Sequence, residues 1–586
     1  MITYMNVAGT AKLKDIMENT MKVFKNPIAL CVGLFASSMT FAADIADVIY
    51  KNGAIYTVND QQKWAQAVAI DDGKFIGVGS NAEVMAFKGA NTKVVDLQGK
   101  FVMPGLVDEH IHPDMGADNY LNIFVSASDS WDTIAEKIRA FRHNNPEKKW
   151  LYGGTINWLA DNSEPIAGSD KPSNRSTLDA IVDDRPIALW DQGAHAMLLN
   201  TMALEELGIT KDTPAPSGGI FVKDADGELT GVIRETAATL VTNALDNVDD
   251  VTWTEKGMKP FLQEMSTYGV TALNDAYGTT KNLDAFRRLE NNGQLNHRIH
   301  VSLVTPLEYS DPQQKKSADI LIRNHKAYAS ELILPYGIKY IMDGSAAGKT
   351  AAMIDPFHGT NFNGDVRYSF EDVEAEMQEY AKLGLAFKAH AIGDRAIRGV
   401  LDIYDRLPEK STRTPNSVSH GTFIHPDDIK RFGETGVVFE ASPALWFPND
   451  GAEIIEKDIG DRVKNLWPIK ELIRTDAIVS YGSDWTVSLT PNPWLGFEAI
   501  ITREVPGGSE DTLYAKHAVE LSTAIEIFTI NGAKAIGLGD KSGSIEVGKY
   551  ADMIVLDRNL FKGDVRKIHQ TQVEKTIFNG KEIYSK

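Results

Sequence analysis

Short apolar stretches alternate with stretches of helical periodicity through the middle of the chain. The apolar stretches are strand candidates at Phe101–Val107, Ile187–Trp190, Val270–Leu273, Ile299–Val304, Ile338–Met342, Ala386–Ala389, Val418–Ser419, Val437–Phe439 and Ile478–Tyr481. Between them, apolar residues recur at helical spacing, as at Ile134, Ile138 and Phe141. This alternation predicts parallel strands that are joined by crossover helices.

The candidates number one more than a (β/α)₈ barrel needs. We assign Ile187–Trp190 to a long insertion, about residues 113–250, that follows the first strand. The other candidates predict an α/β protein whose main body, residues 101–542, is a TIM-type (β/α)₈ barrel. In such a barrel the active site lies at the carboxyl ends of the strands.

Both ends of the chain read as short strands that are joined by tight turns. Asn52-Gly53 and Asp72-Gly73 separate strand candidates near the N-terminus, and Asn579-Gly580 separates two near the C-terminus. Such dipeptides between apolar runs predict β-hairpins. We expect the two ends, residues 43–100 and 543–586, to form one small composite β-sandwich.

The first residues resemble a displaced secretory signal. A basic region around Lys22 precedes an apolar run at Ile28–Ala36, and small residues precede a cleavage point ahead of Ala43. The run is too short to span a bilayer. We expect residues 1–42 to be leader and signal peptide with the true start at Met21. The protein would then be exported, periplasmic or secreted, without a membrane anchor after cleavage; the alternative is a buried N-terminal helix.

This expectation is tested by N-terminal sequencing of the exported protein. The mature chain should begin at Ala43. An intact Met1 or Met21 on the exported protein would contradict the signal-peptide hypothesis.

Composition narrows the chemistry. The formal net charge of -20 makes nucleic acid a poor partner, because phosphate binding needs a basic face. The only cysteine, Cys31, lies inside the predicted signal, so the mature chain has no thiolate to bind a metal. A transition-metal site must then use His, Asp, Glu or a modified Lys.

The strongest local signal is the text VMPGLVDEHIH, in which an apolar run ends in His110 and His112. Alternate side chains of a strand share one face, so the two imidazoles point the same way. Two imidazoles so placed at the end of a barrel strand can bind one cation. By itself the His-x-His spacing also fits ordinary surface or core histidines.

Single polar residues end three later strand candidates. His390 follows Ala386–Ala389, His420 follows Val418–Ser419, and Asp484 follows the last candidate after a short Gly-Ser turn. One histidine alone is most often structural. Equivalent positions in one alternating pattern favour a shared site at the mouth of the barrel.

The chain resembles the amidohydrolase superfamily, in the amidohydrolase-3 branch that includes N-substituted formamide deformylase. The resemblance covers about residues 48–584. It rests on the texts VMPGLVDEHIHP, GIKYIMDGSAAGKTAAMIDPF, HAIGDRAI, SHGTFIHPDDI, GSDWTV and SGSIEVGKYADMIVLD. The resemblance implies a hydrolase that uses one or two divalent transition-metal ions, with zinc as the leading candidate.

The resemblance also implies a set of metal ligands. These are His110, His112, Lys339, His390, His420 and Asp484. Lys339 would act as a CO₂-derived carbamate that bridges two metals, because a bare ammonium repels a cation. The alternative for Lys339 is an ion pair with Asp343 beside a site for one metal.

The implied reaction is hydrolysis of a non-peptide C–N bond, amide or formamide-like, by metal-activated water. Asp484 would be both ligand and general base, taking a proton from water and returning it to the leaving nitrogen. His195 would orient or polarise the substrate from the insertion; capping or packing is its alternative role.

Two other functions remain open at this point. The same ligand set serves deaminases of heterocycles, and a member of the family that has lost catalysis could act in binding or regulation. In each case we expect a small-molecule ligand. We also expect a homodimer, the commonest assembly of soluble proteins.

Overall fold

The structure is a computed structural model. It describes residues 45–125, 129–156, 174–191, 196–216, 219–245, 250–346, 348–408, 414–488 and 490–586. The predicted leader and signal peptide, residues 1–42, lie outside the described residues, and so does His195. Among the described helices, none combines the length and apolar character needed to cross a membrane.

Eight strands form one sheet in which every neighbouring pair is parallel. They are β8 (Leu106–Ile111), β14 (Val270–Gly278), β15 (Arg298–Val304), β16 (Ile333–Ile341), β17 (Ala386–Ala391), β18 (Ser417–His420), β19 (Val438–Ala441) and β20 (Val479–Tyr481). The sheet comes together again where Ile111, the last residue of β8, forms a parallel bridge with Trp485, which lies just beyond β20. The sheet is a nearly closed barrel, so the predicted TIM-type barrel is confirmed.

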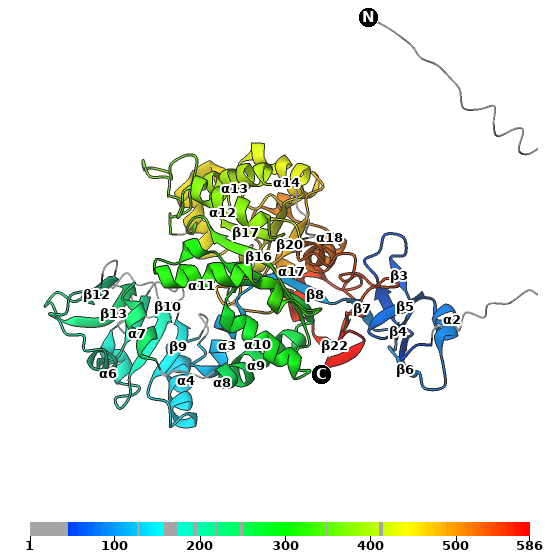
Figure 1. Cartoon of the computed structure of the whole chain (residues 1–586), viewed down its shortest axis with the longest axis horizontal. Helices are drawn as coiled ribbons and strands as arrows, with labels where there is room; N and C mark the ends of the chain where they lie inside the picture. Colours follow the sequence, from blue (N-terminus) through cyan, green and yellow to red (C-terminus); the bar gives the residue numbers. More distant parts are fainter. Residues whose placement is uncertain are drawn as a thin grey trace, which may run out of the picture. The chain divides into compact units, whose positions relative to one another are not determined.

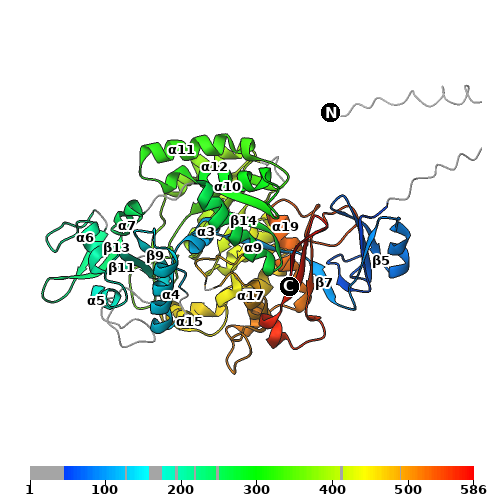
Figure 2. The ribbon, with the colours of Figure 1, turned by 90° about the horizontal axis from the view of Figure 1, so that it is seen from below.

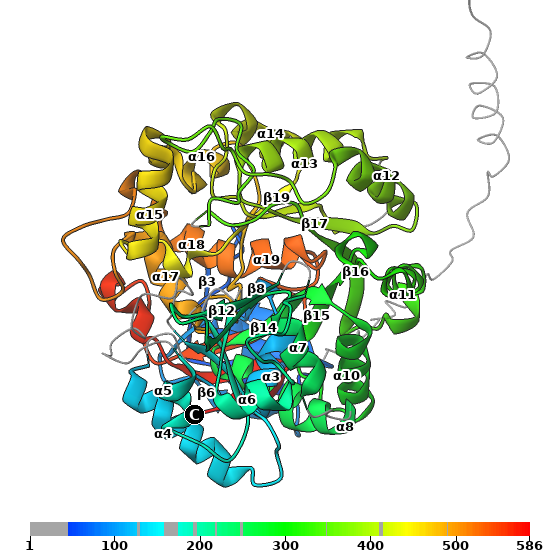
Figure 3. The same ribbon diagram turned by 90° about the vertical axis from the view of Figure 1, so that its left-hand side faces the viewer.

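Helices lie around the outside of these strands (Figure 3). They include α9 (Lys259–Thr267), α10 (Thr280–Asn291), α11 (Pro312–Arg323), α12 (Phe370–Ala381), α13 (Asp394–Arg406), α14 (Ile429–Thr435), α15 (Asp450–Ile459), α17 (Pro493–Thr502), α18 (Leu521–Phe528) and α19 (Ile530–Ala535). In α13, the residues Ile397, Val400, Leu401 and Tyr404 are buried. Their spacing places them on one face of the helix, which packs against the barrel.

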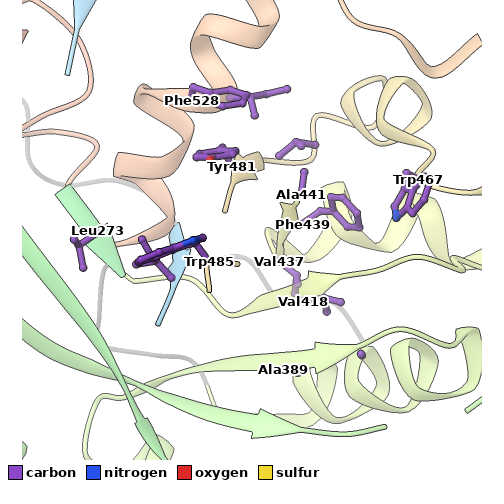
Figure 4. Close-up of a cluster of buried hydrophobic side chains, with 14 of the residues drawn as sticks. Leu273, Ala389, Val418, Val437, Phe439, Ala441, Trp467, Tyr481, Trp485 and Phe528 are labelled. Carbon is purple, nitrogen blue, oxygen red and sulfur yellow. The ribbon is translucent and has the colours of Figure 1, made fainter. Parts of the chain in front are cut away.

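Apolar side chains of the strands and helices form the core of the barrel (Figure 4). Tyr481 of β20 stacks on Phe528 of α18 with ring centroids 4.0 Å apart. Phe528 also contacts Phe497 of α17, at 4.6 Å between centroids. The ring of Phe528 therefore joins the last barrel strand to two helices.

The predicted strand Phe101–Val107 is divided in the structure. Residues Phe101–Pro104 form β7, which pairs with the C-terminal strand β21 (Met553–Leu556), and only the part after Gly105 enters the barrel. A Cβ at Gly105 would lie 2.3 Å from Thr271 Oγ1. Glycine is needed here because the chain passes closely against β14 as it moves from one sheet to the next.

The two chain ends contribute to two further sheets. One sheet has the order β5-β4-β1-β6, and the other has the order β23-β22-β21-β7-β2-β3. Their strands are β1 (Val48–Lys51), β2 (Ala54–Tyr56), β3 (Trp64–Ala65), β4 (Ala67–Asp71), β5 (Lys74–Gly79), β6 (Lys93–Asp96), β22 (Val573–Phe578) and β23 (Lys581–Ser585), besides β7 and β21. Side chains of both sheets share one buried apolar cluster, including Val68, Phe75, Val102 and Met553.

Two of the three predicted hairpins are correct and one is wrong. β4 pairs with β5 around Asp72-Gly73, and β22 pairs with β23 around Asn579-Gly580. In both turns the two central residues have positive φ, as a primed turn requires. At Asn52-Gly53 only Asn52 does, and β1 and β2 belong to different sheets.

A buried arginine attaches the C-terminal sheet to the barrel. Arg298, the first residue of β15, forms an ion pair with Asp552 and a hydrogen bond with Asn579. Its guanidinium lies 3.7 Å from the ring centroid of Tyr550 and 4.6 Å from that of Phe578. The charge is thus paired and covered by aromatic rings, which is what a buried guanidinium needs.

The insertion after β8 carries a sheet of its own. Its strands have the order β12-β13-β11-β10-β9, and its helices include α4 and α6 (Figures 1 and 2). These elements are α4 (Trp131–Asn144), β9 (Leu151–Ile156), α5 (Arg175–Asp179), β10 (Ile187–Asp191), β11 (Ala196–Leu199), α6 (Thr201–Glu206), β12 (Gly219–Lys223), β13 (Leu229–Glu235) and α7 (Ala238–Ala244). The predicted strand Ile187–Trp190 corresponds to β10, which lies in this five-stranded sheet and not in the barrel sheet.

Replacing Phe528 by alanine should destabilise the barrel strongly. Phe528 is fully buried, and the lost ring would leave a cavity between β20, α17 and α18. We expect the free energy of unfolding of Phe528→Ala to fall by about 3–5 kcal/mol in denaturant titrations. Phe362→Ala is the control, since Phe362 is half exposed. Equal losses in the two variants would contradict the packing role of Phe528.

Candidate metal centre

The site residues predicted from the sequence meet at the carboxyl end of the barrel. They are His110 and His112 at the end of β8, Lys339 in β16, His390 in β17, His420 in β18 and Asp484 just beyond β20. This is the end at which TIM-type barrels carry their active sites. His195 lies outside the described residues, so its predicted role stays a prediction.

Asp484 faces both histidines of the first strand. Its Oδ1 lies 3.3 Å from His112 Nε2 and 3.5 Å from His110 Nε2. The ligand atoms of the three residues lie within 4.8 Å of one another. His110 is buried, whereas Asp484 keeps an exposed side-chain fraction of 18%. The group is therefore compact enough to hold one cation and open enough to meet a substrate.

His420 and His390 extend the group across the next two strands. His420 Nδ1 lies 3.9 Å from the second oxygen of Asp484. The ring centroid of His420 is 4.7 Å from that of His110 and also 4.7 Å from that of His390. His390 Nε2 is turned toward the carbonyl oxygen of Gly344, at 3.1 Å.

Lys339 is buried beside the same histidines. Its Nζ lies 3.1 Å from His110 Nε2. Burial, with the neighbouring Lys388 ammonium, lowers the pKa of Lys339 to about 7. Asp343, the alternative partner of Lys339, accepts hydrogen bonds from three backbone N–H groups.

Two backbone hydrogen bonds hold the first strand against the segment after the eighth. Asp484 N–H donates to His110 O at 2.7 Å, and His112 N–H donates to Trp485 O at 2.8 Å. Asp484 and His420 have φ angles of 53° and 70°, in the left-handed region that non-glycine residues rarely adopt. Backbone strain of this kind persists where the surrounding structure enforces it, often at functional sites.

Three histidines of the centre, His110, His390 and His420, have lowered pKa values, which favours the neutral form that binds metals. Burial, with the nearby Lys339, holds the pKa of His110 well below its usual range. Burial and Lys339 also lower the pKa of His390 to about 4. Burial and the neighbouring His110 hold the pKa of His420 well below its usual range as well. The donor set of imidazole nitrogens and carboxylate oxygens thus fits a divalent transition metal.

Sequence reasoning missed Glu440, which stands in β19 next to the centre. Its carboxylate is fully buried, and Oε2 lies 2.7 Å from His110 Nδ1. His110, His420 and Glu440 form a second group whose ligand atoms lie within 4.8 Å of one another. The signal was available, since Glu440 is a charged residue directly after the apolar strand candidate Val437–Phe439.

Sequence reasoning also missed a buried ion pair beneath the centre. Lys388 Nζ lies 2.7 Å from Glu109 Oε2 and donates to the backbone oxygen of Glu109 at 3.0 Å. Both side chains are 2% exposed. Asn274 Nδ2 donates to the other oxygen of Glu109 at 3.3 Å. Lys388 precedes His390 by two residues, so strand alternation could have placed it on the inner face.

The chain is similar to known proteins over most of its length. Residues 93–584 match the profile of the amidohydrolase family. The chain belongs to the amidohydrolase family. N-substituted formamide deformylase of Arthrobacter pascens is 28% identical over 91% of this chain and 97% of the relative. YtcJ of Bacillus subtilis, which is named as an amidohydrolase, is 26% identical over 92% of this chain and 99% of the relative.

A solved structure has the same fold as this amidohydrolase. It is a metal-dependent hydrolase from Pyrococcus horikoshii, with a TM-score of 0.70 and 22% identity. The match covers 88% of this chain and 99% of that chain. Membership of the amidohydrolase family makes this protein a hydrolase. Its His, Asp and Glu groups are of the kind that holds a divalent metal.

Removing one partner of the pair between Lys388 and Glu109 should destabilise the amidohydrolase. Lys388→Met would leave the buried carboxylate unpaired, and we expect the free energy of unfolding to fall by about 3–5 kcal/mol. The double variant Glu109→Gln with Lys388→Met leaves no unpaired charge and should recover most of the loss.

Denaturant titrations of the metal-free chain measure both effects. Lys575→Met is the matched control, because Lys575 and its partner Glu582 are about one-third exposed. An exposed pair contributes at most about 1 kcal/mol. If Lys388→Met lost no more stability than Lys575→Met, the claim that Lys388 compensates the buried charge of Glu109 would be wrong.

Proposed function

We propose that this amidohydrolase cleaves a non-peptide C–N bond in an amide or formamide-like small molecule, with a divalent metal and water. The group of His110, His112 and Asp484 carries the proposal, because its ligand atoms lie within 4.8 Å of one another at the active-site end of the barrel. The relative from Arthrobacter pascens, named N-substituted formamide deformylase, supports this choice of bond.

The metal would be held by imidazole and carboxylate groups of several strands. The proposed ligands are His110, His112, His390, His420, Asp484 and the modified Lys339. Zinc is the first choice for one or two ions with such ligands, although iron, manganese and nickel accept them too. A bound ion would polarise the substrate carbonyl and lower the pKa of water toward neutrality.

Asp484 is the proposed general base. One of its oxygens faces the histidines of β8, the other faces His420, and the side chain remains partly exposed to the mouth of the barrel. Asp484 would take the proton from the attacking water as the new C–O bond forms. It would return that proton to the nitrogen as the C–N bond breaks, which yields a carboxylic acid and an amine; the acid then loses its proton to become the carboxylate.

Lys339 is proposed to react with CO₂ and to bind metal as a carbamate. Its Nζ already lies 3.1 Å from His110 Nε2, on the side of the ring that faces Asp484. A carbamate would replace a cation by an anion at this position. Zinc-loaded protein prepared with ¹³C-bicarbonate should therefore show a carbamate carbon signal in NMR spectra that is lost in Lys339→Ala.

We further propose the remaining features expected from the sequence. The two terminal sheets, which share an apolar cluster, would form a small β-sandwich. The protein would be exported, would act on a small molecule rather than nucleic acid, and would form a homodimer. His195 would contact the substrate from the insertion.

A substrate panel tests the proposed reaction. The zinc-loaded enzyme is offered N-substituted formamides, other small amides and heterocyclic amines, and the release of carboxylate, amine and ammonia is measured. We expect amine and carboxylate from members of the amide set. Ammonia from heterocyclic amines alone would favour a deaminase instead. Absence of turnover together with absence of metal uptake would favour a protein that has lost catalysis.

Asp484→Asn should lower turnover by about 10²–10⁴-fold while metal stays bound, because the amide cannot accept the proton. Asp365→Asn is the control, since the side chain of Asp365 is 85% exposed. Wild-type turnover in metal-loaded Asp484→Asn would rule out the general-base assignment.

A further inference from the structure

Glu440 is a fully buried carboxylate at the wall of the candidate metal centre, and it has no role in the proposed reaction. Its Oε2 lies 2.7 Å from His110 Nδ1, which is a normal hydrogen-bond distance. Residues 110 and 440 come from strands that are separated by β20 in the closed barrel. Burying a carboxylate is unfavourable unless it is hydrogen-bonded. The contact with His110 makes this burial tolerable, and the question is what the buried carboxylate does for His110.

The second oxygen of Glu440 is held as well. Ser442 Oγ donates to Oε1 at 2.8 Å, and the same hydroxyl lies 3.5 Å from His420 Nδ1. Gly482, just beyond β20, lies against both side chains. A Cβ at Gly482 would lie 2.5 Å from His110 Cβ and 2.6 Å from Glu440 Oε1. The carboxylate and the imidazole are therefore locked together by neighbouring strands.

This contact decides which nitrogen of His110 carries the proton. The oxygens of a carboxylate accept hydrogen bonds, so the 2.7 Å contact makes Nδ1, which faces Glu440, the N–H donor. A neutral imidazole carries one N–H proton. If that proton is on Nδ1, Nε2 has none and presents its lone pair. His110 Nε2 is the atom that lies 3.5 Å from Asp484 Oδ1, on the side where His112 Nε2 also lies.

We propose that Glu440 is a positioning residue of the metal centre: by accepting the proton of His110 Nδ1–H, it fixes the ring and its tautomer so that Nε2 is ready to bind the metal. The inference rests on the proposed function, since it requires His110 to be a ligand. A carboxylate behind a ligating histidine orients the ring and raises its basicity, and such partners affect metal affinity by about 10- to 100-fold.

The competing role for Glu440 is that of a direct ligand, together with His110 and His420. The geometry favours positioning, because His110 Nδ1 and Glu440 Oε2 face each other at hydrogen-bond distance and Ser442 occupies the other oxygen. The two roles differ in a measurable way. A lost ligand of a second ion lowers the number of ions bound, whereas a lost positioning residue weakens binding at an unchanged number.

The first experiment compares metal binding by the full chain and its variants. Glu440→Leu removes the acceptor, while Glu440→Gln keeps an acceptor oxygen without the charge. We expect Zn²⁺ affinity, measured by competition with a chelator, to fall about 10- to 100-fold in Glu440→Leu and less in Glu440→Gln. The number of ions per chain, measured by elemental analysis at saturating Zn²⁺, should stay unchanged.

Glu498→Gln is the matched control, because Glu498 is an equally buried glutamate whose partners are Gly507 and His569 rather than the metal centre. Its Zn²⁺ affinity should equal that of the wild type. Wild-type affinity in Glu440→Leu would overturn the proposal, and so would loss of a bound ion in either Glu440 variant.

A second experiment reads the tautomer without metal. The sample is metal-free protein with ¹⁵N-labelled histidine, studied by NMR. The signal of His110 is identified by its disappearance in His110→Gln. In the wild type it should be that of the Nδ1–H tautomer. Lys339 Nζ also faces His110 Nε2, at 3.1 Å, and by donating there it favours the same tautomer, so the variants are compared in a Lys339→Met background. In that background Glu440→Leu should move the signal toward the other tautomer, and an unmoved signal would overturn the positioning role. A wild-type chain that shows this tautomer but binds no divalent metal would contradict the proposed function instead.

Discussion

The geometry of the candidate metal centre depends on two backbone hydrogen bonds between the first barrel strand and the segment after the eighth. They run from Asp484 N–H to His110 O and from His112 N–H to Trp485 O. Because the donors and acceptors belong to the candidate ligands and their neighbours, closing the barrel and assembling the site are one event. The left-handed backbone of Asp484 is maintained at this seam, where the closed sheet over-determines its conformation.

The carboxyl end of the barrel contains several buried charged side chains. Lys388 is paired with Glu109, and Glu440 is paired with His110. Each of these groups would be strongly unfavourable alone, but a partner at hydrogen-bond distance makes its burial tolerable. Replacing a whole buried pair by apolar residues often costs no stability, although removing only one partner is strongly destabilising. The pairs orient the candidate ligands, because a paired side chain beneath or behind a ligand limits the orientations that the ligand can take.

Local patterns in the sequence predicted the barrel well and its boundaries less well. Every predicted barrel strand exists, because a buried parallel strand needs an apolar run and a turn at each end. Phe101–Val107 was predicted as one strand, yet Gly105 divides it between two sheets. The hairpin at Asn52-Gly53 failed for a related reason, since the partners of a strand are chosen by packing between sheets and not by the turn alone.

The sequence by itself determined that a run ending in His-x-His, two further histidines and an aspartate would stand at strand ends, because strand periodicity and barrel topology are local and repetitive. Only the tertiary structure decided which side chains lie behind them. Glu440 is separated from His110 by 330 positions, and Lys388 from Glu109 by 279. No local period relates residues at such separations. Their contact depends on how the strands are arranged around the closed barrel, which places distant residues against each other in the dry interior.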